Sequence, residues 1–320
     1  MKNEKTLYIV VPCYKEEAVL PETSKRLRAK MEALLAAGKI SDKSRVMFVN
    51  DGSKDRTWEI IHQLHQAEPE LFSGVNLARN WGHQNALLAG LMTAVNHADM
   101  VISMDADLQD DVDAVDAMVD AYHNGYDVVY GVRSSRQSDT FFKRFTAESF
   151  YKLMKALGVE IVFNHADYRL MSKRALEGLA QFGEVNLFLR GIVPQIGYPW
   201  TTVEYERHER FAGESKYPLK KMLAFAFDGI TSFSIKPMRL ILVLGVLVFG
   251  VSILMLLYAL ISKLAGSTTA GWTSMMGSIW LIGGIQLLSL GVIGEYIGKI
   301  YSETKQRPRF IIERVLNKTE

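Results

Sequence analysis

Short apolar runs alternate with longer charged segments over the first 135 residues. Runs rich in aliphatic and β-branched residues predict strands that are buried on both faces of a sheet. These runs lie at residues 7–12, 45–49, 75–77, 100–104 and 127–131. The segments between them predict helices at about 16–37, 55–66, 83–96 and 112–123, with Asp55 as an N-cap.

Repeated strand–helix units of this length predict an α/β fold with a parallel, doubly wound sheet. Ligands bind such sheets outside the carboxyl ends of the strands. Polar side chains follow the predicted strands at these ends: Tyr14, Glu16, Asp51, Arg79, Asn80, Asp105, Asp107 and Arg133. The chain lacks Gly-x-Gly-x-x-Gly after the first strand and a Gly-Lys-Ser/Thr loop, so the dinucleotide-binding and P-loop classes lack their fingerprints.

The pattern changes beyond Arg133. Residues 141–157 and 217–233 mix aromatic and basic residues. Such helices, close to a membrane anchor, are typical of segments that lie in the membrane interface. The alternative is that they pack on the sheet.

Two later stretches, 240–262 and 264–294, contain no charged residue. A membrane-spanning helix needs about 20 apolar residues, and a core helix rarely runs so long without a polar face. We expect two spans, at about 240–262 and 273–296. Glycines at Gly283, Gly284, Gly291 and Gly294 would allow helices to approach closely, as in a homo-oligomer.

Basic residues flank the predicted hairpin unevenly. Lys236 and Arg239 precede it, only Lys263 lies in the connecting loop, and six follow it: Lys299, Lys305, Arg307, Arg309, Arg314 and Lys318. The positive-inside rule places both termini in the cytoplasm. The single cysteine, Cys13, and the N-terminus without a signal peptide fit a domain in a reducing compartment.

We therefore expect a multi-pass protein of the cytoplasmic (inner) membrane with four parts. They are a cytoplasmic domain at 1–216, an interfacial helix at 217–236, the hairpin at 237–298 and a basic tail at 299–320. The formal charge of +2 is too small to indicate a nucleic-acid partner.

Asp105 and Asp107 flank Ala106 at the end of the fourth strand. Two carboxylates in this arrangement can approach one Mg²⁺ or Mn²⁺ ion, which also takes oxygens from a diphosphate. The ion then offsets charge on a departing nucleoside diphosphate. Asp-x-Asp alone also fits a solvated turn, but the nearby strand end at Asp51 favours a metal site.

Four segments carry a family resemblance: 11–17, 50–57, 78–84 and 104–110. In this order and spacing they resemble the family 2 glycosyltransferases of the GT-A fold. Within them the chain is similar to the polyprenyl-phosphate glycosyltransferases, the group of dolichol-phosphate mannose synthase and the bactoprenol glucosyltransferases. The paired spans favour the bactoprenol branch, and the resemblance covers nearly the whole chain.

The resemblance implies a mixed, doubly wound sheet and inverting transfer of one sugar from a nucleotide donor to undecaprenyl or another polyprenyl phosphate. The lipid-linked monosaccharide would serve cell-envelope glycosylation. The implied nucleotide contacts are Pro12, Tyr14, Glu16, Asp51, Arg79 and Asp105. The implied metal ligands are Asp105, Asp107 and Gln109, for Mg²⁺ or Mn²⁺. Lys15 and Asn50 depart from the residues that many relatives carry.

Asp167 and Arg169 match the family's Asp-x-Arg element, which faces acceptor and donor sugar, and with Asp107 they form the implied catalytic set. The implied phosphate and acceptor contacts are Arg133, Arg207, Arg210, Ser215 and Lys216. A phosphate acceptor is already anionic near neutral pH, with a second pKa of about 6, so a strong general base is not required. We therefore expect Asp167 to orient substrates and the basic residues to offset repulsion between anions. The alternative for the basic loop is a solvated surface.

Rival functions remain open at this point. A processive polysaccharide synthase would carry a Gln-x-x-Arg-Trp element and further spans, which the chain lacks. A catalytically silent nucleotide-sugar-binding scaffold is the alternative outside the enzymes. Glucose from UDP-glucose is the best candidate donor, and GDP-mannose, UDP-GlcNAc and UDP-galactose are alternatives, because a few polar contacts decide such specificity.

Overall fold

The computed structural model describes residues 5–134, 165–185, 188–206, 236–264 and 271–317. The chain divides into two compact units. One contains the sheet and also takes in the chain from Arg307 onward, and the other contains two long helices. The basic-aromatic segments that we expected in the membrane interface, 141–157 and 217–233, lie outside the described residues.

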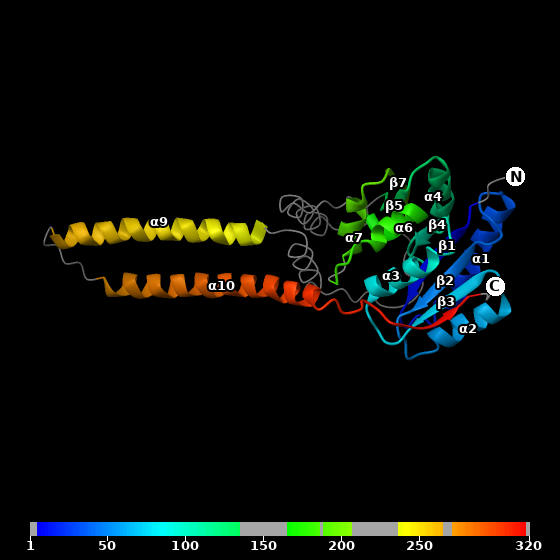
Figure 1. Cartoon of the computed structure of the whole chain (residues 1–320), viewed down its shortest axis with the longest axis horizontal. Helices are drawn as coiled ribbons and strands as arrows, with labels where there is room; N and C mark the ends of the chain where they lie inside the picture. The colour runs from blue at the N-terminus through cyan, green and yellow to red at the C-terminus, as the bar shows by residue number, and fades with distance from the viewer. Residues whose placement is uncertain (1–4, 135–164, 186–187, 207–235, 265–270, 318–320) are drawn as a thin grey trace. The chain divides into compact units, whose positions relative to one another are not determined.

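The sheet has eight strands in the order β7-β5-β6-β4-β1-β2-β3-β8 (Figure 1). They are β1 (Leu7–Cys13), β2 (Arg45–Asn50), β3 (Phe72–Leu77), β4 (Met100–Ser103), β5 (Val128–Arg133), β6 (His165–Ser172), β7 (Trp200–Tyr205) and β8 (Ile312–Leu316). The helices of this unit are α1 (Leu20–Ala36), α2 (Thr57–Ala67), α3 (His83–Ala94), α4 (Ala114–His123), α6 (Lys173–Ala180), α7 (Leu189–Ile192) and the 3₁₀ turn η1 (Val193–Ile196).

The α/β class and the mixed sheet are confirmed. Strands β1 to β4 pair in parallel, whereas β6 runs antiparallel between β4 and β5, and β8 runs antiparallel to β3. The parallel arrangement predicted for the strands of the first 135 residues is therefore confirmed, and β6 and β8 are antiparallel strands that the apolar pattern did not predict. Neither strand gives an apolar run, because β6 begins with polar residues and β8 carries Glu313 and Arg314.

Side chains of β1 alternate between two helical layers, as the two-residue period of a strand requires. Leu7, Ile9 and Val11 belong to one hydrophobic core with apolar side chains of α1, α2 and α4. Val10 points to the opposite face, where α3 lies so close that a Cβ on Gly90 would come within 2.4 Å of it. Helices therefore cover both faces of the sheet, as a doubly wound fold requires.

Helix starts differ from the predictions by a few residues. The first helix begins at Leu20 rather than near Glu16, after Lys15 adopts a positive φ of 58°. The N-cap of α2 is Arg56 rather than Asp55. The Asp55 carboxylate nevertheless accepts hydrogen bonds from the backbone N–H and the hydroxyl of Thr57, so it still serves the start of this helix.

The second unit contains α9 (Lys236–Leu264) and α10 (Trp272–Thr304), which lie side by side (Figure 1). The two predicted spans fall within these helices. Among the described residues, one segment, Leu281–Thr304, is long and apolar enough to cross a membrane, with a mean hydropathy of 1.5. The two-helix transmembrane hairpin is therefore not confirmed and stays a prediction.

The fold predicts that the buried carboxylate of Asp127, which pairs with the more exposed Arg174, contributes to stability. Asp127, just before β5, is 4 % exposed and accepts hydrogen bonds from the Ser172 hydroxyl and the Arg174 guanidinium. Asp127→Ala should lower the free energy of unfolding by about 2 kcal/mol, because Ser172 loses a charged partner. Asp120→Ala, which breaks the exposed pair with Lys39, should cost less than about 1 kcal/mol.

Thermal unfolding of the full chain in detergent measures both values. Burial would raise the pKa of Asp127, but the Arg174 guanidinium and the Ser172 hydroxyl lower it below its usual range. The contribution of Asp127 to the free energy of unfolding is therefore fully present above its ordinary pKa of about 4. It is lost as the pH falls below that value and through the lowered pKa of the folded state. Equal losses for the two variants at neutral pH would contradict the assignment.

Candidate functional site

The pairing of β4 with β6 brings two acidic residues together at the carboxyl edge of the sheet. Ser103 of β4 faces Arg169 of β6 in an antiparallel register, and the Ser103 hydroxyl donates to the backbone carbonyl of Asp167. Because β6 runs the other way, Asp167 lies beside the point where the chain leaves β4 and reaches Asp105. The structure thus brings together two predicted site residues that are far apart in the sequence.

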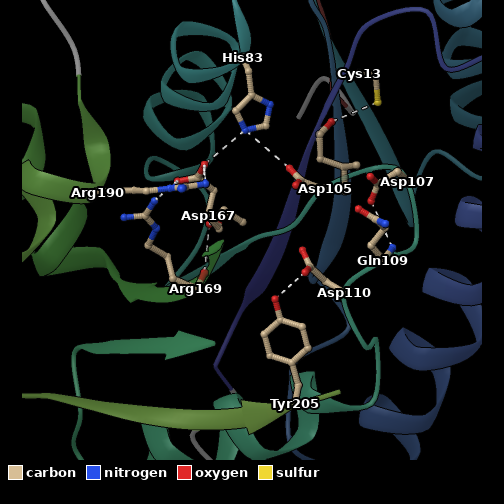
Figure 2. Close-up of polar contacts among 12 residues, drawn as sticks. Cys13, His83, Asp105, Asp107, Gln109, Asp110, Asp167, Arg169, Arg190 and Tyr205 are labelled. Carbon is tan, nitrogen blue, oxygen red and sulfur yellow. Dashed lines mark hydrogen bonds and ion pairs between the residues drawn. The ribbon is translucent and has the colours of Figure 1, made fainter. Parts of the chain in front are cut away.

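His83, the first residue of α3, lies between these carboxylates (Figure 2). Its Nε2 atom is 3.6 Å from Oδ1 of Asp105 and 3.7 Å from Oδ2 of Asp167. Burial alone would lower the pKa of His83, but the two carboxylates raise it above its usual value. The imidazole is therefore biased toward its cationic form.

Two arginines hold Asp167 from the other side. Arg169 lies two residues along the same strand and donates at 2.6 Å, while Arg190 of α7 donates to both carboxylate oxygens at 2.9 and 3.2 Å. Burial would raise the pKa of Asp167, but Arg190, His83 and Arg169 hold it well below its usual range. These cations therefore favour the ionised form of Asp167.

The position of Arg190 depends on a contact between α3 and α7. The Gln84 side chain accepts a hydrogen bond from the backbone N–H of Leu189, at 2.9 Å. Arg169 is 2 % exposed and also donates to the Leu189 carbonyl. Arg169 consequently lies behind Asp167, whereas the Arg190 side chain is 35 % exposed and can reach a bound molecule.

The loop after β4 carries the predicted metal ligands. Leu108 adopts a positive φ of 57°, and the backbone N–H of Gln109 donates to Oδ1 of Asp107 at 3.2 Å. Partial burial raises the pKa of Asp105 to about 6, and His83 opposes that rise. The oxygen donors of Asp105, Asp107 and Gln109 suit Mg²⁺ or Mn²⁺.

Within the described part of the chain, no cluster of three or more His, Cys, Asp or Glu side chains could hold a metal ion. The metal-binding roles of Asp105, Asp107 and Gln109 therefore stay predictions. Mg²⁺ sites commonly use one or two carboxylates, with water and substrate phosphates as further ligands.

Asp51, at the end of β2, is 2 % exposed and organises the neighbouring loop. Its carboxylate accepts hydrogen bonds from the backbone N–H groups of Trp81 and Gly82, at 2.7 and 3.0 Å. The next residue, Gly52, has a φ of 61°, and a Cβ there would lie 2.3 Å from the Arg79 backbone. Asp51 thus positions the backbone that leads into His83, and its direct contact with a nucleotide stays a prediction.

The other predicted nucleotide contacts lie at the carboxyl ends of β1 and β3. Pro12 is buried in β1, while Tyr14 is 45 % exposed beyond it. The backbone N–H of Glu16 donates to the Thr57 hydroxyl. The Arg79 guanidinium stacks 4.0 Å from the centre of the Trp81 ring. These positions surround the edge where a doubly wound sheet binds ligands.

Arg133, at the end of β5, donates from Nε to the Tyr205 hydroxyl at 3.4 Å. The remaining predicted phosphate contacts lie outside the described residues; they are Arg207, Arg210, Ser215 and Lys216. Their roles stay predictions.

His83 and Arg190 are not among the predicted site residues. His83 lies in one of the motif segments, 78–84, so its position at a strand–helix junction was a usable signal. Arg190 lies in the four-residue helix α7 among apolar residues, and only the folded chain brings it to Asp167.

The model for "Glycosyl transferase family 2" matches residues 8–179, and the model for "GtrB C-terminal hairpin" matches residues 236–300. The first contains every predicted site residue up to Arg169. The second coincides with α9 and most of α10.

The chain is similar over its length to several bacterial proteins. It is 52 % identical to the uncharacterized glycosyltransferase YkoT of Bacillus subtilis, over 98 % of this chain and 92 % of that protein. It is 39 % identical to the prophage bactoprenol glucosyl transferase homolog of Escherichia coli, over 96 % and 98 %. A solved mannosyltransferase from Pyrobaculum calidifontis, in complex with GDP-Man and Mn²⁺, covers 95 % of this chain at 15 % identity and a TM-score of 0.46.

Three observations indicate the same family. The predicted motifs lie at the carboxyl edge of a mixed α/β sheet, the family model matches more than half of the chain, and the relatives match over nearly the full length. The chain belongs to glycosyl transferase family 2.

Proposed function

We propose that the protein transfers a single sugar, glucose from UDP-glucose, to undecaprenyl phosphate at the cytoplasmic face of the inner membrane, with inversion at the anomeric carbon. The observation that carries the proposal is the 39 % identity, over nearly the full length of both chains, to the bactoprenol glucosyl transferase of Shigella phage SfX. The product would be a lipid-linked monosaccharide for cell-envelope glycosylation.

The acceptor phosphate does not require a strong general base. Its second pKa is about 6, so its attacking oxygen already carries negative charge near neutral pH. Asp167 is a weak base because its pKa lies well below the usual range. Asp167 therefore orients groups around it rather than abstracting a proton.

An anionic acceptor and an anionic donor repel each other, and the cationic side chains beside Asp167 would reduce this repulsion. Arg190 is partly exposed and fixed by a two-point contact with Asp167. His83 is biased toward its cation next to Asp105. Fixed charges of this kind stabilise a transition state without reorganisation during the reaction.

Asp105, Asp107 and Gln109 would hold Mg²⁺ or Mn²⁺, which offsets the charge that develops on the departing nucleoside diphosphate. Asp51 would act by holding the backbone at Trp81 and Gly82, so that His83 enters the site in a fixed position. The nucleotide would lie along the ends of β1 and β3, beside Tyr14 and Arg79.

The long helices α9 and α10 would anchor the protein in the membrane. Large apolar side chains such as Leu254, Leu287 and Leu290 are each more than 60 % exposed. Contiguous apolar surface of this kind marks contact with a membrane or a partner. A lipid acceptor makes a membrane contact necessary. The basic residues that flank the two helices would place both termini in the cytoplasm.

Asp107→Ala should abolish metal-dependent transfer, because one of two metal-binding carboxylates is lost. The measurement is transfer of radiolabelled sugar from UDP- and GDP-sugars to undecaprenyl phosphate, by purified full-length protein with Mn²⁺ or Mg²⁺. Asp113→Ala, in the same loop but 83 % exposed on its side chain, is the matched control and should keep activity. Absence of transfer from every donor, with nucleotide sugar still bound, would favour the scaffold function.

Asp167→Asn should reduce turnover about 100-fold, the usual cost of losing one preorganised electrostatic contact in an active site. The amide keeps the shape of the side chain but removes the carboxylate that pairs with Arg169 and Arg190. Steady-state kinetics with both substrates measures the effect, with Asp116→Asn on α4 as the control. Wild-type turnover and unchanged KM for both substrates would remove Asp167 from the mechanism.

A further inference from the structure

Three side-chain hydroxyls from separate elements hold the loop that carries Asp105, Asp107 and Gln109. The Thr23 hydroxyl of α1 donates to the Ala106 carbonyl at 2.8 Å. The Tyr168 hydroxyl of β6 donates to the Asp111 carbonyl at 2.9 Å, and the Tyr205 hydroxyl of β7 donates to Oδ1 of Asp110 at 2.6 Å. The loop is therefore fixed at both ends of the acidic segment.

The contact between Asp110 and Tyr205 differs from the other two because its acceptor is a carboxylate. Asp110 and Tyr205 are each 3 % exposed. A buried carboxylate is costly unless it is paired or hydrogen-bonded, and a charged acceptor makes a hydrogen bond stronger. Figure 2 shows the two side chains pointing toward each other, below the Asp107–Gln109 turn.

Tyr205 is itself held in place by the sheet. Its ring packs edge-on against Tyr168 with centroids 5.1 Å apart. Its hydroxyl accepts from Nε of Arg133, and its backbone carbonyl accepts from the N–H and hydroxyl of Ser134. The hydroxyl that holds Asp110 is therefore tied to the ends of β5 and β7.

We propose that Asp110 and Tyr205 are positioning residues for the metal-binding loop, and that the Tyr205 hydroxyl raises the affinity of Asp105 and Asp107 for a divalent cation. The inference rests on the metal site of the proposed function. Asp110 directly follows Gln109, and Leu108 already adopts a positive φ. The backbone of the loop is therefore constrained, and a shift at Asp110 would displace the predicted ligands Asp107 and Gln109.

The test is Mn²⁺ binding to the full-length protein in detergent in the presence of UDP, measured from the electron paramagnetic resonance signal of free Mn²⁺. Tyr205→Phe keeps the ring and removes the hydroxyl. It should raise the Kd for Mn²⁺ about 10-fold, as loss of a partner that orients a metal ligand typically does. In transfer assays it should raise the Mn²⁺ concentration needed for half-maximal activity.

Tyr8→Phe is the matched control, because Tyr8 is also 3 % exposed but lies near the amino end of β1, at the opposite edge of the sheet. It should leave the Kd for Mn²⁺ unchanged, and its melting temperature gives the general cost of a lost buried hydroxyl. Equal Mn²⁺ weakening in both variants would overturn the inference, as would a wild-type Kd in Tyr205→Phe.

Asp110→Asn separates positioning from direct ligation. A loss similar to that of Tyr205→Phe supports positioning. Complete loss of Mn²⁺ binding in Asp110→Asn, with a wild-type Kd in Tyr205→Phe, would make Asp110 a ligand and overturn the inference. If the wild-type protein binds no Mn²⁺ in the presence of UDP, the proposed metal site and this inference both fail. If the wild-type protein binds Mn²⁺ and both variants bind it with the wild-type Kd, this inference fails but the proposed function stands.

Discussion

The antiparallel pairing of β4 with β6 is the constraint on which the site depends. β4 delivers Asp105 and Asp107 to the carboxyl edge of the sheet, and β6 enters the same edge with Asp167. The Ser103 hydroxyl fixes the junction through the Asp167 carbonyl. A register shift by one residue would turn Asp167 and Arg169 to the opposite face of the sheet, because strand side chains alternate.

Charge balance follows from this pairing. His83 lies near both Asp105 and Asp167, and Arg169 and Arg190 pair with Asp167, so these cations offset the negative charge of the two carboxylates. The balance is uneven, since Asp167 stays ionised whereas the pKa of Asp105 rises to about 6. An additional cation beside Asp105 would favour its ionised form, so the proposed metal ion would stabilise the negative charge of this carboxylate.

Local pattern predicted much of the fold, and long-range pairing decided the rest. Strands β1 to β5 were recognisable because buried parallel strands are apolar along their length. β6 was not, since His165 and Asp167 interrupt its apolar pattern, and β8 lies in a charged segment. The same distinction holds for the site: Asp105 and Asp107 form a local motif, but Arg190 acquires its role only through α7 and Gln84.

The strand β8 changes how the long helices relate to the chain. We predicted a basic tail at residues 299–320, but Ile312–Leu316 within it pairs with β3 at the edge of the sheet. Glu313 accepts from the Asn76 side chain, which in turn accepts from Asn50, the neighbour of Asp51. α9 and α10 are thus an insertion within the chain that builds the sheet. A segment that follows the helices therefore contributes the edge strand β8, which pairs with β3 beside the predicted nucleotide-binding motifs.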